Sequence, residues 1–309
     1  MDAVDLRRPA GKTLQLTSDV LRADLAPDIG ASLASLQFMV DGVWVDILRP
    51  ATADALHLRN VREMACFPMA PFASLIHEGM FRWSGRMWRV RPNMPDRPHA
   101  LHGDAWQHPW EVQDAGRNRA VLRYGQDGDR FPFCYEAVLT AVLCSTELAL
   151  TLTVINRDRE PMPAGIGFHP FFQRLPDLTL QFEAGDQWTR DSHGRVLQPE
   201  PCSEEDSFRM PRGVAHLVCN RVYDRWSRCA VLSSRSTKVV TTLKVDGALE
   251  RLLLFSPADR QVLCVEPVSN LPDGFNRLAA GFGDSGARVL EPGESLSGTM
   301  RIVASLSTG

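Results

Sequence analysis

Apolar and polar residues alternate with a period of two along much of the chain. From Tyr135 to Leu143 every second residue is apolar or aromatic, and the pattern resumes from Leu148 to Val154 after a Ser-Thr-Glu turn. This period is typical of strands with one buried face, and two such runs joined by a short polar turn predict a β-hairpin. Further β-rich segments are Met87–Arg91, Ala120–Tyr124, Leu178–Phe182, Val239–Val245, Leu252–Phe255, Val262–Val265 and Leu296–Val303.

Helical signals are weak by comparison. The segment 54–65 could form two or three turns, but its apolar residues keep no single stripe. The segment 203–208 has a capping-box start and is soon stopped by Pro211 and Gly213. No repeat, low-complexity tract or linker divides the chain. We therefore predict an all-β fold of about fifteen to twenty strands in two large packed sheets, forming one domain over residues 1–309.

Composition and charge narrow the class of protein. The 309 residues are 44% hydrophobic and 23% charged, which excludes a disordered or collagen-like chain. A net charge of −3 supplies no basic field for nucleic acid or an anionic membrane surface. No apolar run approaches the length of a transmembrane helix, and Met1–Arg8 lacks the apolar core of a signal peptide. Seven cysteines without a CxxC pair favour reduced thiols, so we expect a cytoplasmic protein.

Two ionisable residues stand directly before prolines in apolar segments, His169 and Glu266. A residue before proline is biased toward extended backbone, so each side chain should project from the end of a strand. Gly165 and Gly167 would let a neighbouring backbone or a ligand come close beside His169. On facing strands, an imidazole can donate a proton near neutrality while a carboxylate removes one. The GxSxG, P-loop and GxGxxG motifs are missing, which disfavours acyl transfer, nucleotide phosphoryl transfer and nicotinamide chemistry.

Structural interpretations compete with these chemical ones. A histidine in an apolar stretch is commonly a hydrogen-bonded structural residue, and a buried carboxylate needs a partner whatever its role. His99, His102 and His108 could form a metal cluster, although their spacing matches no common ligand motif. Four aromatic residues could stack on a ligand, with core packing favoured for at least half of them: Trp106, Trp110, Phe171 and Phe172.

Several segments, in this order, resemble the aldose 1-epimerase (galactose mutarotase) family. They are Leu101-His-Gly-Asp-Ala-Trp-Gln-His-Pro-Trp110, Ala164-Gly-Ile-Gly-Phe-His-Pro-Phe-Phe172 and Val265-Glu-Pro-Val-Ser-Asn-Leu-Pro-Asp-Gly-Phe-Asn276. Cys66–Ile76 resembles the early Phe-Pro-x-x-Pro-Phe-x-Asn-Arg-Ile stretch of the family, and Leu290–Arg301 its final strand. The resemblance covers nearly the whole chain. The motifs taken together and in order are specific to the family, whereas any one of them alone would be weak evidence.

The resemblance implies a large antiparallel β-sandwich with an open sugar-binding cleft. By position, His169 corresponds to the general acid of the family, Glu266 to its general base and His102 to a substrate-binding residue. Asn220 falls where the family usually has a sugar-binding Asp. Known members need no metal and no organic cofactor, so the implied partner is a small-molecule sugar. We expect a monomer or a homodimer.

The chain departs from the family pattern at Ser74-Leu75, where Asn-Arg is usual. Ser74 would still bind substrate, but leucine cannot replace the forked, charged donor of arginine. We therefore expect a carbohydrate epimerase that interconverts the α and β anomers of an aldose or a modified sugar.

Three alternatives stay open. One is a non-catalytic carbohydrate-binding protein of the same fold, and another is a metal-dependent sugar isomerase or lyase that uses the histidines near residue 102. The third is a phosphosugar 1-epimerase in which Arg59, Arg62 or Arg82 meets a phosphate.

Overall fold

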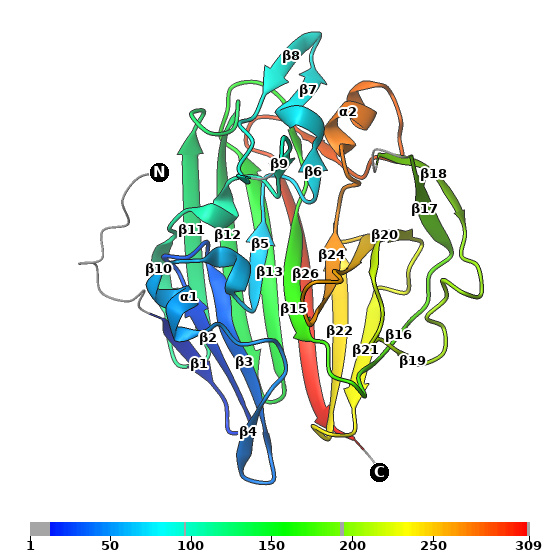
Figure 1. Cartoon of the computed structure of the whole chain (residues 1–309). Helices are drawn as coiled ribbons and strands as arrows, with labels where there is room; N and C mark the ends of the chain where they lie inside the picture. The colour runs from blue at the N-terminus through cyan, green and yellow to red at the C-terminus, as the bar shows by residue number, and fades with distance from the viewer. Residues whose placement is uncertain (1–12, 96, 192–194, 308–309) are drawn as a thin grey trace.

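Two large antiparallel β-sheets pack against each other and make up most of the molecule (Figure 1). The computed structural model describes residues 13–95, 97–191 and 195–307. The N-terminal residues on which the signal-peptide prediction rests lie outside the described residues. The all-β sandwich predicted from the alternation is confirmed. Among the described residues, no helix combines the length and apolar character needed to cross a bilayer.

The larger sheet has eleven strands, and two of its central strands carry the residues predicted to do chemistry. β4 (Val43–Asp46) pairs with β3 off the main path. The main path runs through β1 (Leu14–Thr17), β2 (Leu21–Ala26), β3 (Ser32–Val40), β5 (Cys66–Met69), β15 (Gly167–Gln173), β24 (Val262–Val268), β23 (Arg251–Ser256), β20 (Cys219–Asp224), β17 (Asp186–Arg190) and β18 (Val196–Pro201).

The second sheet has nine strands and contains the predicted hairpin, β12 and β13, whose register closes at Cys144 and Glu147. The C-terminal strand β26 lies between β13 and β22, so the two ends of the chain contribute to different sheets. In order, the strands are β10 (Glu111–Ala115), β11 (Arg119–Asp127), β12 (Cys134–Cys144), β13 (Glu147–Asn156), β26 (Ser295–Leu306), β22 (Val239–Gly247), β21 (Cys229–Ser234), β16 (Thr179–Phe182) and β19 (Arg212–Gly213).

Three two-stranded ribbons and a few short helices complete the described structure. The ribbons pair β14 (Met162–Ala164) with β25 (Arg288–Leu290), β6 (Leu75–Ile76) with β9 (Ala100–Leu101), and β7 (Met80–Trp83) with β8 (Arg86–Arg89). The helices are α1 (Ala53–His57), η1 (Val61–Glu63), η2 (His77–Gly79), η3 (Ala105–Gln107) and α2 (Gly274–Ala279). Figure 1 shows β6 to β9 and α2 gathered at one end of the sandwich.

These elements correct three expectations. The described residues form 26 strands, more than expected, because short ribbon strands such as β6, β9, β14 and β25 produce no visible alternation. The helix expected over 54–65 is divided into α1 and η1, since Leu58 caps the first and Arg59 adopts a left-handed backbone. The segment 203–208 forms turns, and α2 was not predicted because its six residues carry no apolar stripe.

The main hydrophobic core lies between the two sheets, and the larger sheet also has a second apolar surface on its outer face. Along β24, Leu263 and Val265 belong to the main core, whereas Val262, Cys264 and Val268 belong to a separate cluster with Phe67. Successive side chains of a strand point to opposite faces, so this second cluster identifies the outward side of the sheet. That side carries the cleft described next.

Candidate active site

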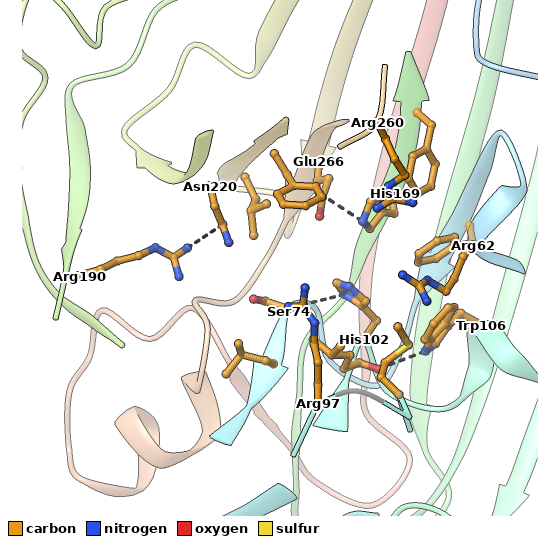
Figure 2. Close-up of a pocket in the computed structure, with 17 residues that line it drawn as sticks. Arg62, Ser74, Arg97, His102, Trp106, His169, Arg190, Asn220, Arg260 and Glu266 are labelled. Carbon is orange, nitrogen blue, oxygen red and sulfur yellow. Dashed lines mark hydrogen bonds and ion pairs between the residues drawn. The ribbon is translucent and has the colours of Figure 1, made fainter. Parts of the chain in front are cut away.

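An open cleft lies over the outer face of the larger sheet (Figure 2). All five predicted site residues line it, although they come from distant parts of the chain. His169 and Glu266 stand on the central strands β15 and β24, and Asn220 stands on β20. Ser74 and His102 come from loops next to the β6–β9 ribbon. The fold therefore brings together the residues that the sequence singled out.

His169 and Glu266 occupy directly opposite positions on adjacent antiparallel strands. The ladder pairs on either side of them are Gly167 with Val268 and Phe171 with Cys264. Opposite residues of an antiparallel pair have side chains on the same face and close together. The imidazole Nε2 lies 3.3 Å from the carboxylate Oε1, and the residues are only 7% and 1% exposed. The two side chains form a contact pair at the floor of the cleft.

The expectation that both residues stand at strand ends is wrong. His169 is in the middle of β15 and Glu266 is the fifth of seven residues in β24. Pro170 and Pro267 remove one N–H each, but they keep the backbone extended, and pairing resumes at Phe171. The prolines therefore interrupt the ladder locally, beside the pair, without ending either strand.

Burial shifts the pKa values of the two groups toward each other. It raises the pKa of the Glu266 carboxyl well above its usual value. It also lowers the pKa of the His169 imidazole well below 6.5, with help from the neighbouring His102, Arg260 and Arg49. Burial disfavours the charged form of each group, which explains both directions. Both shifts favour the uncharged forms, a protonated carboxyl beside a neutral imidazole, which together hold one titrating proton.

The surroundings of His169 favour proton donation. Its ring packs between Phe67 and Phe171, with ring centroids 4.7 and 4.4 Å away. Its Nδ1 is buried and has no hydrogen-bond partner among the described residues. An imidazolium has two N–H donors to satisfy, so this environment stabilises its positive charge poorly. A protonated His169 would give up its proton readily to an acceptor in the cleft.

His102 is held in one tautomer by the backbone of Ser74. The backbone N–H of Ser74 donates to the ring Nδ1 of His102 at 3.1 Å, and the backbone N–H of His102 donates to the Ser74 carbonyl at 2.7 Å. Because Nδ1 is an acceptor, the proton of the neutral ring must lie on Nε2. Burial, together with the charge of Arg97, lowers the pKa of His102 to about 3. His102 is therefore a neutral N–H donor throughout the physiological pH range.

The backbone carrying His102 is strained and closely supported. His102 and Gly103 have φ values of 59° and 71°, and a Cβ on Gly103 would lie 1.9 Å from the Ala70 carbonyl oxygen. Asp104 is buried and accepts hydrogen bonds from the hydroxyls of Tyr124 and Tyr135, at 2.5 and 2.6 Å. Strain of this kind persists only where the surrounding contacts determine the conformation. The loop therefore fixes the position of the imidazole.

A similar clamp supports the Ser74 loop. The Asn270 side chain accepts from the Ala73 N–H at 3.0 Å and donates to the Ala73 carbonyl at 2.9 Å. Gly165 makes room for it, since a Cβ there would lie 2.0 Å from the Asn270 amide oxygen. A close approach by a backbone or a ligand was expected at this glycine; the structure places the Asn270 side chain there instead. Sequence patterning gave Asn270 no separate role, because its partner is almost 200 residues away.

Asn220 lies on the opposite side of the cleft from Trp106 in Figure 2. Its amide oxygen accepts a hydrogen bond from Arg190 at 3.2 Å, which leaves the amide NH₂ as a donor for a ligand.

Leu75 also lines the cleft, at the position where the family usually has arginine. Of the four candidate stacking aromatics, Trp106 and Phe171 line the cleft, whereas Trp110 and Phe172 belong to the main core.

The three histidines proposed as an alternative metal cluster are separated. His99 packs against His77, His108 stacks on Tyr124, and only His102 lines the cleft. Among the described residues, the one group of possible ligand atoms within 4.8 Å of one another belongs to His169, Cys264 and Glu266. Burial raises the pKa of the Cys264 thiol well above its usual value, which disfavours the thiolate that metals bind. The side chains in this group fit proton transfer better than metal binding.

Arginine is the residue type that sequence reasoning largely missed. Arg62, Arg97, Arg190 and Arg260 all line the cleft. Only Arg62 was a candidate, and the other two candidates, Arg59 and Arg82, do not line it. The missed arginines lie in loops or at a strand end with no local motif, so no pattern marked them.

Comparison with known proteins agrees with this architecture. The model of the family described as "Aldose 1-epimerase" matches residues 12–303. The Escherichia coli protein YphB, which is uncharacterised, is 26% identical over 277 residues, covering 85% of this chain and 91% of its own.

Three solved structures have the same fold. One from Escherichia coli K12 has a TM-score of 0.84 and 22% identity, covering 96% of this chain and 99% of its own. A galactose mutarotase-like protein from Clostridium acetobutylicum has a TM-score of 0.82 and 18% identity, covering 94% of both chains. Galactose 1-epimerase from Lactobacillus acidophilus has a TM-score of 0.76 and 16% identity, covering 97% of both. Since the family model matches nearly the whole sequence, the chain belongs to the aldose 1-epimerase family.

Proposed function

We propose that this protein interconverts the α and β anomers of an aldose or a modified sugar, using no cofactor. The observation that carries the proposal is the buried contact between His169 Nε2 and Glu266 Oε1 at the floor of an open cleft. A pair that shares one proton can take a proton from one oxygen of a sugar and give one to another. Anomer exchange needs these two transfers and no separate nucleophile.

In the proposed mechanism, the pair reacts in its carboxylate–imidazolium form, the tautomer of the same one-proton state in which Glu266 has passed its proton to His169. Glu266 takes the proton of the C1 hydroxyl while His169 protonates the ring oxygen, and the C1–O5 bond breaks to give the open-chain aldehyde. Rotation about the C1–C2 bond presents the other face of the carbonyl. The ring closes as both proton transfers reverse, so the pair ends in its starting protonation state.

The remaining predicted residues have binding roles in this proposal. His102 would donate its Nε2–H to a sugar hydroxyl, because its Nδ1 is occupied by the Ser74 amide. Asn220 would donate through its amide NH₂, and Ser74 has a hydroxyl at the cleft wall. Trp106 and Phe171 line the cleft but are only 2% and 4% exposed, so their role in this proposal is to support its apolar wall.

Anomer-exchange NMR tests the proposal directly. Exchange between α and β resonances would be measured with and without protein across aldoses, deoxy sugars, uronates and sugar phosphates. We expect acceleration for at least one class and its loss in the Glu266→Gln protein. If no sugar in the panel exchanges faster, while sugars still bind, the chain is a non-catalytic carbohydrate-binding protein and the proposal fails.

A further inference from the structure

The charged residues that line the cleft are almost all of one sign. Among the described residues of the lining, four are arginines and the single carboxylate is Glu266, whose pKa is raised by burial. The lining includes no lysine and no aspartate. A cleft of one charge sign with low-dielectric walls concentrates the electric field and attracts ligands of the opposite sign. An uncharged sugar has no net charge with which to interact with this field.

One acidic residue nearby reduces the positive charge only in part. Glu63 lies 3.5 Å from Arg49 and 4.0 Å from Arg260, so it is shared between two guanidinium groups. An excess of positive charge therefore remains over the cleft.

Arg62 and Arg97 are the arginines best placed to bind a ligand. Figure 2 shows both side chains pointing into the cleft, on either side of His102 in this view. Neither guanidinium has an ion-pair or hydrogen-bond partner among the described residues. Arg59 is only three residues from Arg62 but pairs with Asp28 at 3.7 Å and does not line the cleft. The positive charge of Arg97 also helps to lower the pKa of His102.

We propose that the substrate is an aldose with an anionic group, a phosphate or a carboxylate, that Arg62 and Arg97 bind. The inference rests on the proposed anomer exchange and specifies its substrate class. Guanidinium groups match both anions because they present paired N–H donors in a fixed plane. The chain has leucine where its family usually has a sugar-binding arginine, and it has arginines elsewhere around the same cleft.

An anionic group on the substrate must leave C1 and the ring oxygen free for the proposed proton transfers. The substituent on C5 does so, and a hexose 6-phosphate and a hexuronate both carry their charge there.

The test compares matched sugars that differ in this group. Exchange rates would be measured by NMR for glucose and galactose, for their 6-phosphates, and for glucuronate and galacturonate. We expect kcat/KM to be at least about tenfold higher for one anionic series than for the neutral sugars, and this advantage to shrink as ionic strength rises. The series with the advantage distinguishes phosphate from carboxylate.

Arginine variants test the assignment of the binding residues. In Arg62→Gln and Arg97→Gln, the ratio of anionic to neutral kcat/KM should fall by roughly ten- to a hundredfold, the effect of losing a hydrogen bond to a charged group. Arg59→Gln is the matched control and should leave the ratio unchanged. An unchanged ratio in both cleft variants would overturn the assignment to these arginines.

Calorimetric binding to the Glu266→Gln protein separates this inference from the proposed function. Glucose 6-phosphate or glucuronate should bind at least tenfold more tightly than glucose. Equal binding and equal exchange of neutral and anionic sugars would overturn the anionic substrate while leaving anomer exchange intact. Selective anion binding without exchange of any sugar would overturn anomer exchange and leave the anion selectivity standing.

Discussion

At the scale of single residues, the proposal depends on whether His169 and Glu266 transfer protons or only support the fold. We predict that His169→Asn and Glu266→Gln each lower anomer exchange by about 10²–10⁴-fold, since neither replacement can exchange protons near neutrality. Both keep approximate shape and hydrogen-bonding capacity, so far-UV circular dichroism should match the native protein. The double variant should be little worse than either single one, because groups acting as a unit are not additive.

A structural role predicts a different result for the same variants. The buried pair would then contribute mainly to stability, and each substitution would lower Tm while exchange fell only in proportion to folded protein. Full exchange activity in the Glu266→Gln protein would rule out the proposed mechanism.

The pKa shifts of the pair predict the pH dependence of exchange. Its working form holds one proton, so activity is lost at low pH when a second proton binds His169 and at high pH when the pair loses its proton. Burial lowers the pKa of His169 well below 6.5 and raises that of Glu266 well above 4.5. We therefore expect the acid limb of the kcat/KM profile to lie below pH 6.5, the pH at which an exposed imidazole is half protonated.

The measurement needs a substrate that does not itself titrate in this range. Phosphate esters have a pKa near 6, so a neutral sugar or a uronate should be used, with the uncatalysed rate subtracted. His102 does not interfere, because its pKa is about 3. An acid limb centred at or above pH 6.5 would contradict the assignment of that limb to a buried His169.

At the scale of elements, the loop over residues 101–104 determines where His102 points. We predict that Gly103→Ala lowers both Tm and exchange, because its Cβ would lie 1.9 Å from the Ala70 carbonyl oxygen at a φ of 71°. Gly85→Ala is the matched control, since Gly85 has a φ of 75° and nothing within 4 Å of its Cβ. In this control the substitution adds only the strain of placing alanine in a left-handed backbone conformation, which lowers stability by about 1–2 kcal/mol. Equal Tm changes in the two variants would show that the close approach is unimportant.

The elements also show what could be predicted from the sequence. All seven β-rich segments overlap strands of the structure. Most alternate because one face lies in the core, whereas β8 is largely exposed and β23 and β24 are buried on both faces. The pre-proline positions of His169 and Glu266 indicated extended backbone but could not give the register that makes them opposite neighbours. Register depends on long-range pairing, and so do the support of Ser74 by Asn270 and the gathering of the arginines. The five candidate residues could therefore be named from the sequence, but their register and the arginines around the cleft could not.

At the scale of the molecule, the chain order makes the two sheets mutually dependent. The larger sheet takes strands from β1 to β24, and the second sheet takes strands from β10 to β26. The main core includes residues from Leu16 to Ala304. No cut between two consecutive segments would leave each half with a complete sheet and a complete core.

This interdependence predicts one cooperative unfolding transition for the protein, as expected for the single domain predicted from the sequence. In particular, β26 pairs with both β13 and β22, so it cannot detach without dividing the second sheet. The measurement is differential scanning calorimetry, with the calorimetric enthalpy equal to the van't Hoff enthalpy when unfolding is two-state. Limited proteolysis provides an independent check and should yield no stable half. Two resolved transitions, or a stable fragment that keeps one sheet, would show that the sheets fold as separate units and that the cleft rests on only one of them.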